Sequence, residues 1–434
     1  MKKLLFIAAL STLCLSMSAT THMYVRTHDG GSYKYSLEEV KDVVFFEDGD
    51  YVMDVTDSNI ELKFRIISDS TVEVAAPPSS YNPYVVTSCA IPDKVRIDGK
   101  EYTVTGIGKG AFHRCKNLRN IELPSTITNI GAFAFAGCEK LGDISFPDNL
   151  SVIGDSAFFG CSTLSYVDFP SSLSSIGDCA FSECHGLSDI RIPSKVKNIG
   201  IAPFSYCRGL KATVVDPENP NFKSLDDILY DKDFTTLINA PAGIEKEDIS
   251  VPSSVTKIGD AAFLGCHKIL SVEIPSGVTT IGRYAFGECI SLTEINIPSS
   301  VSSIGGLAFW WCRNLRSIEI PSGVTTIESW TFVGCSSLVE VKLPSSVTSI
   351  AESFSGCRSL KSINIPSGVT AIAPYTFMDC SSLESLTLSS NVTSIGQSAF
   401  CRCNNLELII DNNKENVKIE NNALEDCKSV TYLK

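Results

Sequence analysis

The sequence predicts a mainly-β repeat solenoid, and three regularities indicate it. Cysteine recurs in steps of 22 to 24 residues with one interruption, at Cys115, Cys138, Cys161, Cys184, Cys207, Cys266, Cys289, Cys312, Cys335, Cys357, Cys380, Cys403 and Cys427. Phenylalanine stands three residues before each of these cysteines except the last, where Leu424 replaces it. Proline follows the same period, as at Pro275, Pro298 and Pro321. A fixed period of this length is typical of one supersecondary unit stacked on copies of itself.

One unit, from Ile274 to Pro298, shows how these residues build a coil. Leu292, Ile295 and Ile297 have the L-x-x-L-x-L spacing of a leucine-rich repeat. The alternation of Ile295 and Ile297 predicts a short strand with both side chains inward, and neighbouring units pair such strands into a parallel sheet. Pro298 ends the strand because it cannot donate to the ladder. We expect each coil to be right-handed. Its return segment is β-branched and interrupted by glycine, so we expect extended segments or short turns there.

The phenylalanines form the most constant column of the repeat and predict the core. The column contains Phe112, Phe135, Phe158, Phe181, Phe204, Phe263, Phe286, Phe309, Phe332, Phe354, Phe377 and Phe400. Rings stacked at one height bury a large apolar area and gain further from offset aromatic contacts. An aromatic track for a ligand is the alternative interpretation, and burial is the default for such a column.

The period breaks between Cys207 and Cys266, which are 59 residues apart. We interpret residues 211–250 as an irregular repeat with an insertion, in which 214–222 form a loop and 228–237 a hairpin projecting from the coil. A solenoid also needs covers for its end coils. We expect a small N-terminal β module over 20–58, capping hairpins over 59–105, and repeats over 106–434 whose last unit is polar.

The first residues predict export from the cell. Lys2 and Lys3 precede an apolar run that ends at Leu15, and small residues follow up to Ala19. This layout is typical of a secretory signal peptide over residues 1–19. An N-terminal membrane anchor and a lipoprotein signal at Cys14 are the alternatives. No other stretch reaches the length of a membrane span, so the expected location is secreted or on the cell surface.

Composition argues against several classes of function. The formal net charge is −13, and no basic stripe is visible, so we expect no nucleic-acid partner. The five histidines have no metal-ligand spacing, the serines recur at turns, and no phosphate-binding glycine loop occurs. We therefore expect no catalytic residues, no metal and no cofactor. The roughly 70 residues outside the repeats are too few for most enzymes.

The column cysteines raise the question of disulfides, because the chain is expected to be exported. Cysteines one repeat apart lie on adjacent rungs about 4.8 Å apart. A relaxed disulfide needs its Cβ atoms nearer, at about 3.8 Å. We therefore interpret the column cysteines as small buried hydrophobic residues with free thiols, and expect Cys179 and Cys401, which lie off the column, to be more exposed.

The repeat unit I-P-x-x-V-x-x-I-G-x-x-A-F-x-x-C-x-x-L-x-x-I-x-I-P resembles the BspA-like leucine-rich repeats over about residues 91–434. These repeats occur in secreted and surface proteins of host-associated bacteria. The resemblance implies adhesion or recognition at host surfaces, including the extracellular matrix, with a protein or glycan as the partner. Repeat scaffolds change partners easily, so the resemblance does not identify one.

Two surfaces are candidates for binding. The first is the outward column of the sheet, which is polar and varied: Glu122, Ser145, Asp168, Arg191, Glu273, Asn296, Glu319, Lys342, Asn364 and Thr387. The second is a stripe formed by Tyr284, Leu307 and Trp330, each five residues before a column cysteine, with Trp310 and Trp311 beside it. Other coils hold Gly110, Ser156, Ala261 or Glu352 at this place. Exposed aromatic patches mark interfaces; packing of one ring against the next coil is the alternative.

Together these observations predict a non-catalytic leucine-rich-repeat binding protein with adhesin-like recognition of host or cell-surface macromolecules. A structural or accessory surface protein without a host ligand is the alternative.

Overall fold

The computed structural model describes residues 22–26, 32–36, 51–55, 61–76 and 86–434. The signal peptide expected over residues 1–19 lies outside these ranges. The chain forms two compact units, Met1–Tyr51 and Val52–Lys434. In the first unit, strands β1 (His22–Arg26) and β2 (Ser32–Ser36) pair antiparallel.

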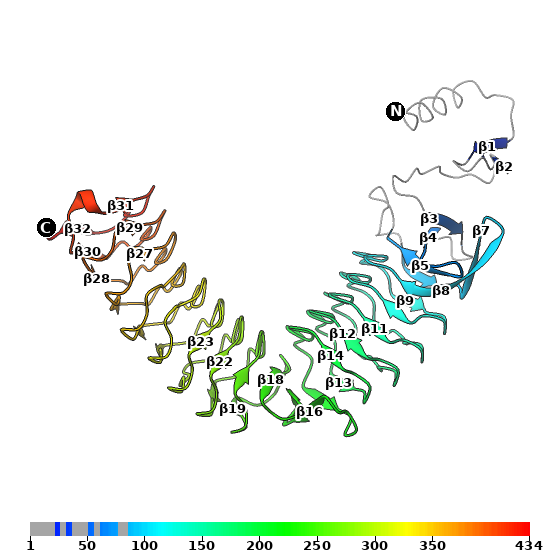
Figure 1. Ribbon diagram of the computed structural model, residues 1–434, viewed down its shortest axis with the longest axis horizontal. Coiled ribbons are helices and arrows are strands. Elements are labelled where there is room, and N and C mark those ends of the chain that lie inside the picture. The colour runs from blue at the N-terminus through cyan, green and yellow to red at the C-terminus, as the bar shows by residue number, and fades with distance from the viewer. Residues whose placement is uncertain (1–21, 27–31, 37–50, 56–60, 77–85) are drawn as a thin grey trace. The chain divides into compact units, whose positions relative to one another are not determined.

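The second unit is a stack of coils, and Figure 1 shows them following one another from cyan to red in chain order. One side of the stack is a ladder of short parallel strands, as the alternation of Ile295 and Ile297 predicts. It is interrupted and contains β6 (Ser88–Ala90), β9 (Asn120–Glu122), β13 (Asp189–Ile192), β15 (Ala212–Val215), β19 (Asp248–Ser250), β21 (Ser271–Glu273), β24 (Ser317–Glu319), β25 (Glu340–Lys342), β26 (Ser362–Ile363), β28 (Ser385–Leu388), β30 (Glu407–Ile410) and β32 (Ser429–Tyr432). We call this side the sheet face.

The return segment of each coil also forms a parallel ladder, which goes beyond the extended structure expected there. Its strands are mostly two residues long, and each of these ends on an isoleucine: β10 (Asn129–Ile130), β11 (Val152–Ile153), β12 (Ser175–Ile176), β14 (Asn198–Ile199), β20 (Lys257–Ile258), β22 (Thr280–Ile281), β23 (Ser303–Ile304), β27 (Ala371–Ile372), β29 (Ser394–Ile395) and β31 (Lys418–Ile419). A single 3-10 turn, η2 (Lys414–Asn416), precedes β31 within the described chain.

Two hairpins precede the first regular coil. Strand β4 (Glu61–Ile66) pairs antiparallel with β5 (Thr71–Ala75), and β7 (Lys94–Ile97) pairs antiparallel with β8 (Lys100–Ile107). Strand β3 (Tyr51–Val55) lies at the far edge of this sheet. The hairpins continue the return ladder, because β8 pairs parallel with both β5 and β10.

The phenylalanine column is the core of the stack, as its constancy predicts. Neighbouring rings lie nearly parallel, with centroids 5.0 to 5.9 Å apart. The backbone holds the same register, because the Phe286 N–H donates to the Ala308 carbonyl of the next coil at 2.8 Å. Each ring is thus buried by the coil before it and the coil after it.

The column cysteines are buried beside the rings as free thiols, except for Cys427 in the last coil, which is half-buried. From Cys138 to Cys403 each column thiol donates to a backbone carbonyl of the preceding coil: the Cys312 thiol, for example, donates to the Phe286 carbonyl at 3.0 Å. Burial raises the pKa of the Cys335 thiol to about 12, so this thiol stays protonated at neutral pH. Cys179 and Cys401 are half-buried, in line with their places off the column.

The irregular coil interrupts both ladders and the column. The hairpin expected over 228–237 consists of β17 (Ile228–Asp231) and β18 (Thr236–Asn239), and a further strand, β16 (Phe222–Leu225), precedes it. Strand β18 also joins the return ladder by pairing with β20. Ala240 takes the place of the phenylalanine, since its N–H donates to the Ala262 carbonyl at 2.7 Å.

The core divides at the same point. One apolar cluster runs from Leu62 to Leu229 and the other from Ile228 to Ala423. Coupling between coils comes from contacts with the nearest neighbours. We therefore expect the coupling between coils to be weakest at the irregular coil.

We predict that column residues carry stability and sheet-face residues do not. Phe286→Ala removes a fully buried ring and should cost about 3–5 kcal/mol of unfolding free energy. Glu319→Ala removes an exposed side chain whose ion pair with Lys342 is 3.5 Å long and solvated, so it should cost less than about 0.5 kcal/mol. Chemical denaturation measures both, and equal losses would contradict the column assignment.

We predict that the column thiols are reduced and unreactive until the protein unfolds. Their burial keeps them protonated and out of reach of reagents, and the thiolate is the reactive form. Thiol counting on protein that was never reduced should find them free in denaturant and protected without it. Recovery of most column cysteines as disulfides would show that the rung geometry is wrong.

We predict that the two halves of the stack open separately. Phe309→Ala should speed amide hydrogen exchange in residues 263–423 and leave exchange in residues 107–204 nearly unchanged, because neither ladder crosses the irregular coil without interruption. Phe158→Ala, in the other half, is the matched control and should give the reverse pattern. Uniform acceleration over both halves in either variant would argue for a single cooperative unit.

Candidate binding surface

Opposite the sheet face, each coil turns through the residues from five to one before its column cysteine, such as Tyr284 to Glu288 before Cys289. We call the stacked turns the turn edge. Both ends of each turn are left-handed: φ is 55° at Tyr284 and 52° at Glu288. The two left-handed residues let the chain reverse within five residues while their N–H groups donate to the next coil.

Glycine fits these two positions best, because it lacks the Cβ atom that makes left-handed backbone unfavourable. Gly110, Gly137, Gly160, Gly265, Gly334 and Gly356 occupy them in some coils. Seven other positions of this kind carry bulky apolar residues: Phe133, Tyr206, Tyr284, Leu307, Trp311, Trp330 and Tyr375. Left-handed backbone costs such a residue about 1–2 kcal/mol. The backbone conformation alone therefore does not favour these side chains.

The structure brings three of the five expected site residues into contact. The Tyr284 and Trp310 rings meet edge to face with centroids 6.1 Å apart, and the Trp310 and Trp311 centroids are 5.6 Å apart. Tyr284 and Trp310 are half-buried, whereas Trp311 is 38% exposed and Trp330 is 52% exposed. The aromatic stripe is thus a surface feature at these four residues.

The expectation of a continuous exposed stripe is wrong at Leu307, because its side chain is only 5% exposed. Its position is shared by Tyr284 on the preceding coil and Trp330 on the following coil. The backbone hydrogen bonds from Tyr284 to Gly306 and from Leu307 to Ser329 place the three coils side by side. The shorter side chain lies between two larger ones, and it is buried although it belongs to none of the apolar clusters of the described core.

The sequence analysis missed three aromatic residues of the turn edge. Phe133 and Tyr375 occupy the same position as Tyr284 in other coils and are 42% and 40% exposed. Tyr206 occupies the second left-handed position, as Trp311 does. Counting backwards from every column cysteine, instead of from three neighbouring ones, would have found them.

Two of the rings rest on glycines of another coil. A Cβ atom added at Gly334 would lie 2.5 Å from Cδ1 of Trp311, and one added at Gly265 would lie 2.8 Å from Cδ1 of Tyr206. The glycines therefore make room for the rings as well as for the left-handed backbone. Trp311 and Tyr206 therefore lie directly against the backbone of these glycines.

Arginine side chains cover parts of the rings. The Arg283 guanidinium lies 5.2 Å from the Tyr284 ring centroid, and that of Arg313 lies 4.4 Å from the Trp311 centroid. Such cation–π contacts hold the guanidinium group in one orientation while it remains exposed to solvent.

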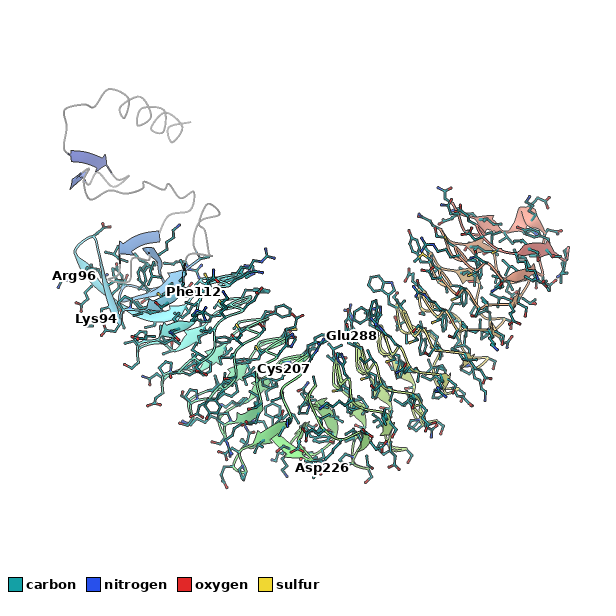
Figure 2. The ribbon with its side chains drawn as sticks, turned by 180° about the vertical axis from the view of Figure 1, so that it is seen from behind. Lys94, Arg96, Phe112, Cys207, Asp226 and Glu288 are labelled. Atoms are coloured by element: carbon teal, nitrogen blue, oxygen red, sulfur yellow. The ribbon has the colours of Figure 1, made fainter. Side chains whose placement is uncertain are left out.

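Glu288 lies at the centre of the turn edge. Its Oε1 accepts a hydrogen bond of 3.2 Å from the Tyr206 hydroxyl, although the two residues are 82 positions apart. Figure 2 shows Glu288 near Cys207, the neighbour of Tyr206, and Asp226 of the irregular coil on the opposite side of the stack. His267 Nε2 lies 3.9 Å from Glu288 Oε2. Burial lowers the pKa of His267, as does the Arg208 charge.

The sheet face carries polar side chains instead of aromatic rings. Its outward side chains are exposed, and a shallow hollow on it is lined by Glu273, Glu294, Glu319, Glu340 and Lys342 with neighbouring residues.

Among the described residues, no three His, Cys, Asp or Glu side chains are grouped so that they could hold a metal ion. Within the same ranges, no helix has the length and hydrophobicity needed to cross a membrane.

Comparison with known proteins agrees with this architecture. The BspA type leucine-rich repeat region matches residues 88–223, 242–353 and 302–431. A leucine-rich repeat protein from Eubacterium ventriosum has a similar crystal structure, with 25% identity, a TM-score of 0.67, and coverage of 82% of this chain and 95% of that one. The pneumococcal vaccine antigen PcpA is similar in fold, with 20% identity, a TM-score of 0.60, and coverage of 89% and 100%. Curated protein sequences offered no match. The repeat register, the stacked core and these matches together show that the chain belongs to the BspA-type leucine-rich repeat family.

Proposed function

We propose that this chain is a non-catalytic binding protein, and that its turn edge recognises a macromolecule on a host or cell surface. The family consists of repeat scaffolds, which present extended surfaces to partners. The expected signal peptide over residues 1–19 would export the chain to such a surface. A protein or a glycan is the expected class of partner, including components of a host extracellular matrix.

The observation that carries the proposal is the presence of large aromatic residues at strained, exposed positions. Trp330 has a φ of 66° and is 52% exposed, so its ring gains little from packing and its backbone is unfavourable. The turn requires a left-handed residue here in every regular coil, so it is the choice of a bulky side chain, and not the backbone itself, that departs from what the fold favours. Exposed tryptophan and tyrosine are also the residues that most often dominate the free energy of binding.

The alternative is a structural or accessory surface protein in which the rings stiffen the stack. The edge-to-face contact between Tyr284 and Trp310 favours it, because these rings join neighbouring coils. Trp330 distinguishes the binding role from the structural role, because its side chain contacts no other aromatic ring among the described residues. The same residue therefore makes the sharpest test.

We predict that Trp330→Gly leaves the unfolding free energy unchanged within about 1 kcal/mol, because relief of left-handed strain offsets the lost ring contacts and the entropy of glycine. Binding to a surface partner, captured from host-matrix or cell-surface extracts and identified, should weaken at least tenfold. Thr331→Gly is a matched control, because this neighbouring side chain is buried and should affect stability more than binding.

A double variant extends the test to the rings that touch each other. Tyr284→Ser with Trp330→Ser should preserve the fold, because small residues occupy this position in other coils. If the double variant loses several kcal/mol of stability while binding to the captured partner is unchanged, the rings are structural and the proposed function is wrong.

A further inference from the structure

Cationic side chains gather at the centre of the turn edge, although the whole chain carries a formal net charge of −13. Arg208 and Arg313 are exposed. Both lie near enough to His267 to lower its pKa, after the larger effect of burial, whereas Glu288 acts in the opposite direction. Glu288 therefore lies among three basic side chains, and a second carboxylate, Glu183, lies near Tyr206. This combination offers an anion two positive charges, one of them on a guanidinium stacked on the Trp311 ring, and offers hydroxyl groups a carboxylate acceptor.

The charged groups are held in place by the rings around them. Arg313 is stacked on Trp311, which rests on Gly334 of the next coil. Glu288 is fixed by the Tyr206 hydroxyl at 3.2 Å. Groups that are already ordered lose little conformational entropy when a ligand binds. The cluster is thus better prepared for a ligand than free surface side chains are.

The irregular coil makes this cluster possible. No residue from 235 to 260 has a left-handed backbone, so this coil contributes no turn to the edge. Tyr206 consequently extends past it to Gly265 and Glu288. A small apolar cluster of Ala202, Ala261 and Leu264, with Tyr206 and Tyr284 packed against it, closes the same gap. Residues from both halves of the stack therefore meet at one place.

We infer that this cluster binds an acidic carbohydrate, a short oligosaccharide bearing a carboxylate on one of its rings. The inference deepens the proposed function and rests on it. A guanidinium held in one orientation recognises a carboxylate with two hydrogen bonds. Glu288 accepts hydrogen bonds from ring hydroxyl groups, and the exposed parts of Trp310 and Trp311 contact the apolar C–H face of a sugar ring.

Other ligands satisfy only part of the cluster. An acidic peptide supplies carboxylates and few hydroxyl groups, so Glu288 would repel it without compensation. A neutral sugar supplies hydroxyl groups and leaves the two arginines without an anion. The cluster reaches from Arg208 on the coil of Cys207 to Arg313 on the coil of Cys312. Because Tyr206 meets Gly265 at the turn edge, four coils span about 14 Å at a rung spacing of about 4.8 Å, which suits a short saccharide rather than a folded protein domain.

The test compares acidic oligosaccharides with their own methyl esters, which keep the ring and lose the charge. Immobilised sialylated, glucuronate-containing and galacturonate-containing oligosaccharides, each as free acid and as ester, are probed with the full chain at low salt. At least one free acid should bind roughly tenfold or more tightly than its ester, the effect of one charge-assisted contact. Added salt should weaken the difference.

Two variants test whether the preference for the free acid over its ester depends on the turn edge. Arg313→Gln should remove the discrimination between acid and ester. Arg316→Gln is the matched control: it removes the same charge from the same coil, but directly before the sheet-face strand β24, and should leave the discrimination intact. Circular dichroism confirms that both variants are folded.

The outcomes separate this inference from the proposed function. If no free acid binds better than its ester, or if Arg313→Gln keeps the preference, the acidic-sugar site is wrong. Partner binding that still depends on Trp330 in that case would leave the proposed function standing. If neither sugars nor captured partners depend on the turn-edge residues, both are wrong.

Discussion

The contact between each phenylalanine ring and the rings of the adjoining coils is the interaction on which the rest of this structure depends. One coil is too thin to bury its own apolar side, so it is stable only when its ring lies between two others. The stacking distance of 5.0 to 5.9 Å matches the rung spacing of the parallel ladders. The ring, the thiol and the strand residues are consequently confined to fixed places, and the chain must reverse within five residues on the far side.

That short reversal explains where variation is tolerated. It needs two left-handed residues in each coil, and glycine is the least strained choice. Several coils nevertheless place tryptophan, tyrosine or phenylalanine there. The sheet face varies without such strain, because its outward side chains are exposed to solvent and make only surface contacts with one another. The turn edge is therefore the surface where residue choice departs from what the fold favours, and this departure is what supports the proposed binding role.

The irregular coil interrupts the repeat and thereby brings together a cluster of side chains that the regular coils lack. Ala240 replaces the ring, both ladders stop, and the core divides into two clusters. The same coil contributes no turn to the edge, so Tyr206 crosses the gap to Glu288. The column is broken at this coil, and a mixed cluster of rings, arginines and carboxylates forms beside it.

The period, the buried columns and the inward strand residues could be predicted from the sequence, because each follows from the spacing of residues along one coil. The position of the irregular repeat could be predicted because the period breaks there. Exposure at the turn edge was decided only by the tertiary structure: Leu307 and Trp330 share one position, yet the first is buried and the second exposed, since burial depends on the side chains of the adjoining coils. Spacing also could not bring Tyr206 to Glu288, which are 82 residues apart. Their contact depends on how the irregular coil packs, and no period within the chain describes that coil.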